Sequence, residues 1–523
     1  MTVSTRSDAL VRADPPSTTE SRPRGEPLRV AIVGFGKMGQ HHARAIGHIP
    51  GARVVAIVDP SNGARASARE IVPQARVFSS LPELLESGIA DVVHICTAPH
   101  THEALATAAV AAGCHIYVEK PFGQSVAGVE PVLALARSNG VRICAGHQLL
   151  FEAPARDALT LLPALGELVH LESFFSFRTV RRSPDGRAPL RADLQLLDIL
   201  PHPVYLLLEF LERAAPGETT RLASLDIGPA GTVHALVRRG SVTGTLVVTL
   251  EGRPVESYLR AIGRNGVVHA DFVRGTVQRL IGPGTSGIDK ALNPYRVAGQ
   301  LVGGTTRALF RRIVGRQRSY PGLIEIMEAF YGAIARGEES PISPEGILET
   351  TRIWEQVAAA FAEWSRQAEA EQPRTAVAPG RARALVTGGT GFLGKEVVRA
   401  LVSEGSGARV LARRTPPSWE RVPGAEYVTG DAGAPLAPPL LQGVDVVVHC
   451  AAETAGGWEE HERNSVAATE HVLRAAAAAG VKRFIHVSSL AVLTSRDGGT
   501  ALNEDAPLEP DARSRGPYVW GKL

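Results

Sequence analysis

Two glycine-rich turns constrain the fold of this 523-residue chain more than any other feature. Each turn follows a short apolar run, 28–33 in the first case and 384–387 in the second, and each leads into a helix-like segment. A strand that enters a glycine turn and leaves as a helix opens a doubly wound sheet of parallel strands. The sequence therefore predicts two α/β domains in one chain.

The first turn carries three glycines in the spacing GxGxxG: Gly34, Gly36 and Gly39. The first permits a tight turn, the second lets the backbone approach a pyrophosphate, and the third lets the helix pack closely on the strand. A second apolar run, 52–58, ends in Asp59, where a carboxylate would bind the ribose 2′-hydroxyl of NAD. We therefore expect an NAD-binding Rossmann domain over 27–148, after a disordered segment over 1–26.

Two further apolar runs, 91–96 and 115–118, alternate with helix-like segments and extend the predicted parallel sheet. Ligands of such sheets bind beyond the carboxyl ends of the strands. The residues expected near the cofactor are therefore those that follow the two runs: Thr97, Pro99, His102, Glu119 and Lys120. Of these, His102 is more simply a structural residue of the cofactor wall. Pro121 permits a cis peptide bond that would fix the direction of Lys120.

Taken together, the run GFGKMG, Asp59, the run TAPHTH at 97–102 and the triplet EKP at 119–121 resemble the glucose–fructose oxidoreductase, inositol dehydrogenase and MocA (Gfo/Idh/MocA) family. The resemblance covers about 27–365. It implies that the Rossmann domain is followed by an α+β domain with an open antiparallel sheet over 149–365. It also implies an enzyme that exchanges hydride between NAD and a hydroxyl-bearing carbon of a sugar, polyol or nucleotide-sugar.

The chemistry of that exchange asks for a cation and a base. Lys120 would stabilise the developing alkoxide, and a neutral base would accept the hydroxyl proton. The segment from Asp198 to His202 resembles the D-x-x-x-H segment of the family, and its spacing would put both side chains on one helix face, with Asp198 orienting the imidazole. Three departures stand nearby: the glycines that usually precede the Asp are absent, Pro201 can break the helix, and Tyr205 stands where the family often has a second Asp. The alternative is a non-catalytic dinucleotide-binding scaffold or sensor.

The second turn has the form TGxxGxxG, with the glycines Gly388, Gly391 and Gly394. The apolar run 409–412 is followed by Arg413 and Arg414 rather than by an acid, which favours a 2′-phosphate and therefore NADP over NAD. Asp431 follows another short run and could contact the adenine.

The end of the chain adds Ser489 and a YxxxK motif formed by Tyr518 and Lys522. With the second glycine turn, these residues resemble an extended short-chain dehydrogenase/reductase of the NAD-dependent epimerase/dehydratase family over 383–523. The resemblance implies that Tyr518 exchanges a proton with substrate, Lys522 favours the phenolate, and Ser489 holds the substrate oxygen, with Ser488 as the fallback. Because the chain ends one residue after Lys522, we expect a C-terminally truncated domain that binds a cofactor without turnover.

Composition narrows the remaining possibilities. A net charge of +3 argues against nucleic acid as a partner, and no apolar run is long enough to span a membrane. The N-terminus has no apolar core of a signal peptide, which predicts a cytoplasmic protein. Four isolated cysteines predict buried thiols and no metal site. We also expect a linker over 366–382 and a homo-oligomer that pairs through an exposed sheet face.

The segment 281–320 departs from the family pattern because it carries seven cations and one anion. Its apolar and basic residues alternate at partly helical spacing, as in helices that contact anionic lipid, and they could also form a basic mouth for a phosphate-bearing substrate. We prefer the simpler interpretation of a solvated insertion or an oligomer contact, and keep peripheral membrane contact as the alternative.

Overall fold

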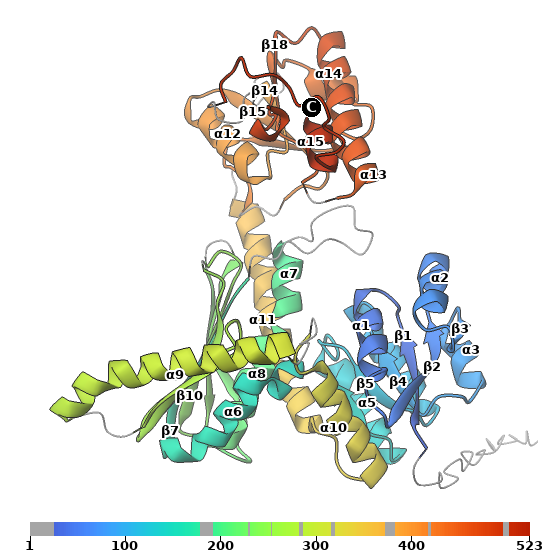
Figure 1. The fold of residues 1–523 in the computed structure, drawn as a ribbon, viewed down its shortest axis with the longest axis vertical. Helices are drawn as coiled ribbons and strands as arrows, with labels where there is room; N and C mark the ends of the chain where they lie inside the picture. The colour runs from blue at the N-terminus through green and yellow to red at the C-terminus, as the bar shows by residue number, and fades with distance from the viewer. Residues whose placement is uncertain are drawn as a thin grey trace, which may run out of the picture. The chain divides into compact units, whose positions relative to one another are not determined.

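The structure is a computed structural model that describes residues 26–177, 192–228, 231–252, 254–281, 286–314, 320–371, 382–416, 420–454, 456–494 and 502–523 (Figure 1). The expected disordered segment therefore lies outside the described residues except at its last position. Two compact units share the chain. The first comprises 1–168, 204–216 and 260–355, and the second comprises 169–203, 217–259 and 356–523.

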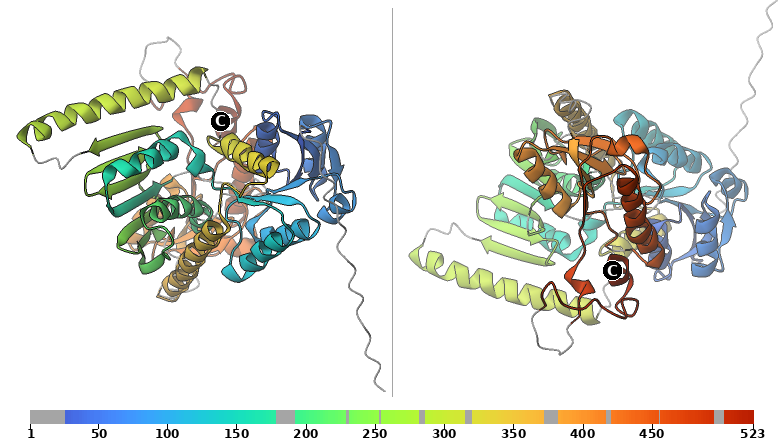
Figure 2. Two further views of the ribbon diagram at one scale, coloured as in Figure 1. Left: turned by 90° about the horizontal axis from the view of Figure 1, so that it is seen from below. Right: turned by 90° about the horizontal axis from the view of Figure 1, so that it is seen from above.

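A six-stranded parallel sheet in the order β3-β2-β1-β4-β5-β6 confirms the first predicted domain. Its strands are β1 (Leu28–Val33), β2 (Ala52–Val58), β3 (Arg76–Phe78), β4 (Val92–Ile95), β5 (His115–Val118) and β6 (Ile143–Ala145). Its helices are α1 (Lys37–Ile46), α2 (Asn62–Ile71), α3 (Leu81–Glu86), α4 (His102–Ala111) and α5 (Val126–Ser138). From the centre of the sheet the chain winds outward in both directions. Because crossovers between parallel strands are right-handed, this winding puts helices on both faces of the sheet and leaves β1 and β4 almost fully buried (Figure 2).

The second sheet has seven strands in the open order β13-β12-β11-β7-β10-β9-β8. They are β7 (Leu168–Ser176), β8 (Arg221–Ile227), β9 (Val233–Arg239), β10 (Val242–Thr249), β11 (Ser257–Gly263), β12 (Gly266–Asp271) and β13 (Thr276–Ile281). The hairpins β8–β9, β9–β10 and β12–β13 are antiparallel, but β7 and β10 run parallel. The sheet is therefore mixed rather than purely antiparallel, because a long crossover lets β10 return beside β7 in the same direction.

The helices before, between and after these strands are α6 (Ala153–Leu161), α7 (Ala192–Ile199), α8 (Pro201–Ala214), α9 (Gly287–Val314), α10 (Leu323–Arg336) and α11 (Pro344–Glu371). The expectation that Asp198 and His202 share one helix face is wrong. Asp198 is the last residue but one of α7 and His202 is the second residue of α8, because Pro201 begins a new helix, as a proline at a first helical position favours. The linker prediction is also partly wrong, since α11 continues to Glu371 and only 372–381 lie outside the described residues.

A third sheet, parallel and five-stranded in the order β16-β15-β14-β17-β18, confirms the second predicted α/β domain. Its strands are β14 (Ala382–Thr387), β15 (Gly407–Ala412), β16 (Glu426–Thr429), β17 (Val446–His449) and β18 (Arg483–His486). Its helices are α12 (Phe392–Ser403), α13 (Trp458–His461), α14 (Ala468–Ala478) and α15 (Pro517–Lys522). Two buried apolar clusters form its core, one around Leu385 and Val447 and one around Val386 and Val410.

Across the described ranges, no helix is both long enough and apolar enough to cross a lipid bilayer.

Candidate functional site

In the first glycine turn, two glycines are required by close backbone packing, and the third borders open space. Gly34 has a φ of +89°, and a Cβ there would lie 2.9 Å from the backbone oxygen of Cys96. A Cβ on Gly39 would lie 2.0 Å from the oxygen of Gly34, so α1 could not pack against β1. A Cβ on Gly36, by contrast, would meet open space. The turn thus exposes backbone at the N-terminus of α1, which fits the approach of a pyrophosphate.

Asp59 holds this turn against the end of β2. Its two carboxylate oxygens accept hydrogen bonds from the backbone N–H groups of Phe35 and Ser61, both at 2.8 Å. The guanidinium of Arg65 donates to the Asp59 backbone oxygen at 2.7 Å. The carboxylate keeps lone pairs for a ribose hydroxyl. Arg65, which the sequence analysis missed, puts a cation beside the same position, of the kind that accommodates a 2′-phosphate.

His102 joins the loops that follow β4 and β5. Its Nδ1 lies 2.8 Å from the oxygen of Pro121, and its Nε2 lies 3.1 Å from the oxygen of Thr97. Burial lowers the pKa of His102, against the effect of these two carbonyl oxygens, which favour the protonated ring. The Lys120–Pro121 bond in the second loop is cis, and Lys120 itself is half-buried. His102 therefore connects the Thr97 loop with the loop that carries Lys120.

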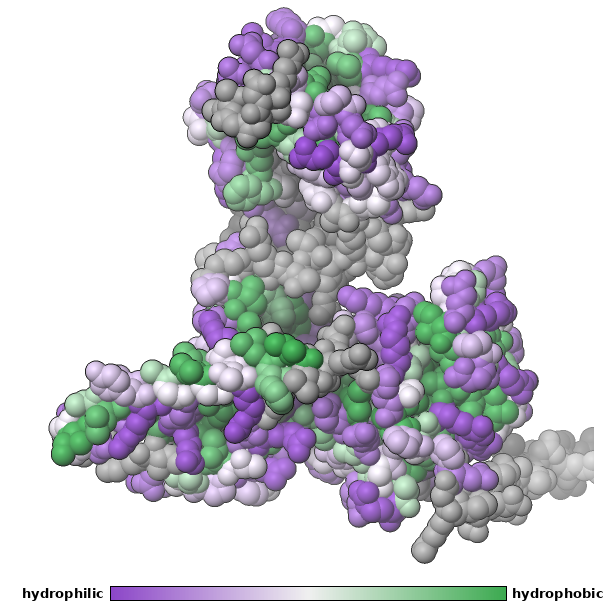
Figure 3. All heavy atoms as spheres, in the orientation of Figure 1, coloured by the Kyte–Doolittle hydropathy of each residue, from purple (hydrophilic) through white to green (hydrophobic). Residues whose placement is uncertain are grey.

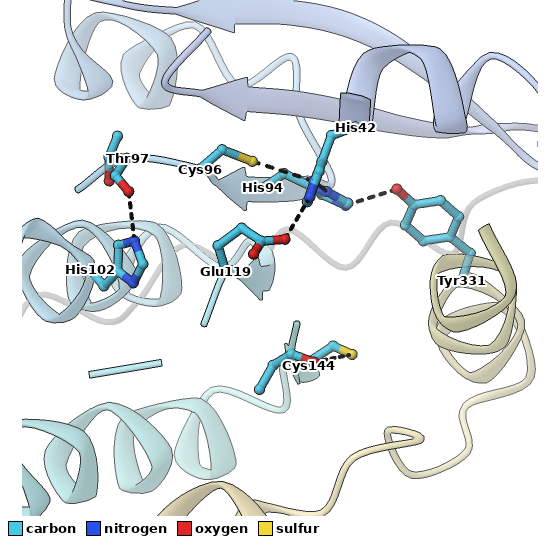
Figure 4. A network of polar contacts seen from close by, with 9 residues as sticks. His42, His94, Cys96, Thr97, His102, Glu119, Cys144 and Tyr331 are labelled. Atoms are coloured by element: carbon cyan, nitrogen blue, oxygen red, sulfur yellow. Dashed lines mark hydrogen bonds and ion pairs between the residues drawn. The ribbon is translucent and has the colours of Figure 1, made fainter. Parts of the chain in front are cut away.

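A buried polar chain lies behind this loop and connects four elements (Figure 4). His42 Nε2 lies 2.8 Å from the carboxylate of Glu119, and His42 Nδ1 lies 2.9 Å from His94 Nδ1. His94 Nε2 in turn lies 2.8 Å from the hydroxyl of Tyr331 on α10. Both imidazoles are fully buried, and the ring of Tyr117 stacks on His94 at 4.7 Å.

The partners fix where the protons lie in this chain. An ionised Glu119 only accepts, so His42 donates through Nε2 and accepts at Nδ1. His94 then donates through Nδ1 and accepts at Nε2, where the Tyr331 hydroxyl donates. The Cys96 thiol lies 3.4 Å from the same His42 nitrogen, and burial raises the pKa of Cys96 and keeps its proton in place.

Burial and neighbouring groups shift the pKa of both His94 and Glu119. Burial lowers the pKa of His94 well below its usual range, so the ring is neutral. Burial alone would raise the pKa of Glu119, but the hydrogen bond from His42 and the nearby charges outweigh it and lower that pKa. This row of buried polar side chains therefore contains one carboxylate, that of Glu119, immediately before Lys120 in sequence.

Sequence reasoning found Glu119 but missed the three residues that hold it: His42, His94 and Tyr331. A signal was present for the first two. His42 falls on the sheet-facing side of α1, and His94 interrupts the apolar run of β4. Tyr331 gave none, because it lies 237 residues from its partner in sequence.

Tyr205, which stands where the family has an acid, belongs to the core. Its hydroxyl accepts a hydrogen bond from the Leu149 N–H at 3.1 Å, and its ring stacks on His147 at 4.2 Å. Burial lowers the pKa of His147 to about 3, so this ring is neutral. His147 immediately precedes the short helix η2 (Gln148–Phe151), and Tyr205 belongs to α8. The pair is therefore a packing contact between these two elements.

The second glycine turn also has glycines at positions where a Cβ would meet backbone atoms. Gly388 has a φ of +67°, and a Cβ there would lie 2.7 Å from the Ala451 nitrogen. A Cβ on Gly394 would lie 2.2 Å from the oxygen of Gly388, and one on Gly391 would lie 3.2 Å from the same atom. Thr387 supports the turn, since its hydroxyl lies 2.7 Å from His449 Nδ1 and accepts from the Ala451 N–H at 3.3 Å.

Two of the polar residues predicted for this second site lie at strand ends. Arg413 is exposed after β15, and Asp431 follows β16, with its carboxylate accepting from the Gly433 N–H at 2.9 Å. Their positions at the carboxyl edge of the sheet are those expected for cofactor contacts.

The third sheet also brings α15 to the end of β18. The Lys522 ammonium donates to the oxygen of Val487 at 2.8 Å, and the Ser488 hydroxyl donates to the oxygen of Lys522 at 3.1 Å. Burial lowers the pKa of Lys522. Ser489 accepts from the Ala491 N–H at 3.2 Å and begins a short 3-10 turn. Tyr518 contacts the ring of His461 edge-on at 6.2 Å. Of the two serines, Ser488 is the one bonded to Lys522.

Two family models match separate parts of the chain. Residues 28–147 match an oxidoreductase family with the NAD-binding Rossmann fold. Residues 384–523 match the NAD dependent epimerase/dehydratase family. The two matches coincide with the six-stranded and five-stranded parallel sheets.

Individual relatives match shorter stretches. Inositol 2-dehydrogenase 1 of Saccharopolyspora erythraea is 36% identical over 140 residues, which cover 26% of this chain and 42% of that protein. Ceramide reductase of Caulobacter vibrioides is 38% identical over 150 residues, which cover 26% of this chain and 46% of that protein. The chain thus spans less than half the length of these curated relatives.

Among solved structures, the WlbA dehydrogenase from Bordetella pertussis, in complex with NADH and UDP-GlcNAcA, is similar with a TM-score of 0.50. Its sequence identity is 17%, and the match covers 65% of this chain and 97% of that one. At this identity the likeness shows a common fold.

Proposed function

We propose that this chain is an NAD(P)-dependent oxidoreductase acting on CH–OH groups. Residues 28–147 match the oxidoreductase family with the NAD-binding Rossmann fold, and residues 384–523 match the NAD dependent epimerase/dehydratase family. The single observation that carries the proposal is the open space beside the backbone of Gly36, at the same edge of the sheet where the Glu119–Lys120 loop follows β5. A turn with that opening suits a dinucleotide, and a lysine at a strand end suits an oxygen that becomes negative.

Different residues of the first domain would bind the cofactor and the substrate. The backbone at Gly36 and the N-terminus of α1 would hold the pyrophosphate, and Asp59 would bind the adenosine ribose. Thr97 and Pro99 would line the same edge. NAD supplies the hydride acceptor when it is bound. Lys120 would hold the substrate oxygen and stabilise it as its proton leaves.

His202 is our proposed proton acceptor, oriented by Asp198. The break before Pro201 puts the two side chains on different helices, so the pair would act across a helix junction rather than along one face. Its role is proposed on chemistry alone, since imidazole is the side chain whose ordinary pKa suits proton exchange near neutral pH.

The proposed substrate class is a sugar, a polyol or a nucleotide-sugar. It rests on the names of relatives and neighbours, an inositol dehydrogenase and a dehydrogenase bound to UDP-GlcNAcA. Since another relative is named for ceramide reduction, the corresponding ketone belongs in the same substrate panel.

The second domain is proposed to bind NADP in preference to NAD. The support is the exposed guanidinium of Arg413 at the end of β15, where an acid would bind the 2′-hydroxyl of NAD. Asp431 would meet the adenine. Tyr518 and Lys522 would be the proton-exchange pair of this domain, and Ser489 would hold the substrate oxygen. Ser488, whose hydroxyl donates to the backbone oxygen of Lys522, is the fallback.

The test is turnover and cofactor binding on the purified full chain. Reduction of NAD is followed with a panel of inositols, free sugars and nucleotide-sugars, oxidation of NADH is followed with the ketone, and binding is measured by titration calorimetry. Lys120→Ala is expected to lower kcat at least about a hundredfold while NAD affinity stays within about threefold. Lys482→Ala, an exposed lysine paired with Asp445 in the second domain, is the matched control and keeps both values.

The outcomes separate the enzyme from the scaffold. A Lys120→Ala variant with native turnover refutes the role of the ammonium. NAD binding without turnover of any substrate in the panel favours the scaffold or sensor, and absence of NAD binding contradicts both.

A further inference from the structure

We infer that the outward face of α9 docks on an anionic lipid surface. The helix lies along β13, the edge strand of the seven-stranded sheet (Figure 1). The Gln300 amide replaces a neighbouring strand there, accepting from the Arg279 N–H at 2.8 Å and donating to the Arg279 oxygen at 3.0 Å. One face of α9 is therefore fixed against the protein, where it covers the backbone groups of an edge strand.

The same inner stripe continues along the helix at four-residue intervals. A Cβ on Gly304 would lie 3.3 Å from the Thr276 side chain, and a Cβ on Gly275 would lie 3.5 Å from Ala308. Gln300, Gly304 and Ala308 recur once per helical turn, so they mark one line along α9. Residues half a turn away from this line face away from the sheet.

The outward face is apolar instead of polar. Its large side chains are between 44% and 77% exposed: Ile288, Leu292, Tyr295, Val302, Leu309, Phe310 and Ile313. Figure 3 shows hydrophobic residues gathered toward the two ends of this helix. A helix that packs on its own protein normally turns its apolar stripe inward and its polar residues outward. The preferred interpretation of this segment as a solvated insertion does not account for an outward apolar stripe.

Cations border this face. Arg296 and Arg307 are exposed and lie eleven residues apart, which is three turns and therefore the same side of the helix. The anion Asp289 is paired with Arg296 at 3.2 Å. An exposed apolar face bordered by arginines is the arrangement of helices that lie in a membrane interface, where anionic headgroups attract the cations and the acyl region takes the apolar side chains.

A second copy of the chain fits this face less well. The apolar residues follow a three-four repeat, which is the pattern of a coiled-coil seam. One set of seam positions, however, consists of Leu292, Gly299, Thr306 and Ile313, so two of its four members are not hydrophobic. Pairing two such helices would also bring their arginines together, and Asp289 is the only acidic residue in α9 that could offset the repulsion. Anionic headgroups supply the complementary charge that a second copy lacks.

The test is flotation of the full chain with vesicles of phosphatidylglycerol and phosphatidylcholine in equal parts, compared with phosphatidylcholine alone. The native chain is expected to float with the first and not with the second. Arg296→Gln/Arg307→Gln is expected to weaken binding about thirtyfold, since each cation near an anionic surface contributes about fivefold. Val302→Glu/Leu309→Glu is expected to weaken binding at least about tenfold.

The matched control introduces the same charge on exposed leucines outside α9. Leu473→Glu/Leu508→Glu changes two side chains that are 48% and 60% exposed, and it is expected to float like the native chain. Native flotation of the Val302→Glu/Leu309→Glu variant, equal flotation of all chains, or no flotation of the native chain overturns the proposal. So does a native dimer that Val302→Glu/Leu309→Glu converts to a monomer, because a second copy then covers the face. None of these readouts depends on turnover, so they leave the proposed function untouched.

Discussion

Replacing His42 with alanine removes the donor on which the buried Glu119 carboxylate depends. In the native chain, the imidazole lies 2.8 Å from that carboxylate, and both side chains are buried. Without this donor, Glu119 is left as a buried charge without compensation, which costs about 3–5 kcal/mol in the free energy of unfolding. His42→Ala is therefore expected to destabilise the first domain by about that amount.

Two companion variants show whether the charge is the cause. Tyr331→Phe removes only the hydroxyl that donates to His94, so it is expected to cost about 1–2 kcal/mol, the penalty of one unsatisfied buried acceptor. In the double variant His42→Ala/Glu119→Gln, no buried charge remains. It is therefore expected to recover at least about 2 kcal/mol relative to the sum of the single variants.

The assay must report on the first domain alone, because the chain holds several domains that can unfold separately. Hydrogen exchange by mass spectrometry on peptides from α1 and β4 provides that resolution, with peptides from β14 and α12 as internal controls. If His42→Ala costs no more than Tyr331→Phe, or if the double variant shows no recovery, Glu119 does not carry the buried charge and the proton assignment is wrong.

The remaining predictions concern pH. Burial lowers the pKa of His115 to about 4 and that of His147 to about 3, so both rings stay neutral when folded. Each contributes stability that is present above the unfolded pKa of about 6.5 and is lost as pH falls, by about 1.4 kcal/mol per pH unit down to about 4. Urea midpoints measured between about pH 7 and 5 should fall accordingly, and less steeply for His147→Gln; an equal slope contradicts the assignment. Burial beside Glu325 raises the pKa of Glu152 to about 8, so its stabilising protonated form is lost as pH rises through that value. Glu152→Gln should match the native chain near pH 4 and exceed its stability by about 2–5 kcal/mol near pH 9, and an equal effect at both pH values excludes the shift.

Local sequence patterns predicted the parts of the fold that are themselves local. A strand, a glycine turn and a helix are adjacent in sequence, so the spacings at Gly34 and Gly388 were sufficient to predict two parallel sheets. The acid at Asp59 and the arginine at Arg413 follow from the same rule, because both sit where a strand ends. The mixed sheet could not be predicted in this way, since the parallel pairing of β7 with β10 depends on a crossover of more than sixty residues.

The buried chain behind Lys120 shows what local patterns omit. His42, His94 and Tyr331 come from α1, β4 and α10, and no spacing in the sequence connects them. The helix at 287–314 was partly readable from its periodicity, but periodicity gives only the presence of an apolar stripe. Which stripe faces the protein depends on β13, and there Gln300 and two small residues, Gly304 and Ala308, take the inner face.

A nicotinamide dinucleotide is proposed to lie across the first glycine turn, and a single substitution tests its place there most directly. A methyl group at Gly36 meets open space, so Gly36→Ala should leave the stability of the chain unchanged or raise it by about 0.4–1 kcal/mol. Gly51→Ala, which also meets open space but lies outside the turn, is the matched control. In calorimetric titration with NAD, the account predicts that Gly36→Ala loses at least about tenfold in affinity while Gly51→Ala binds like the native chain. Equal NAD affinity in all three proteins would contradict it.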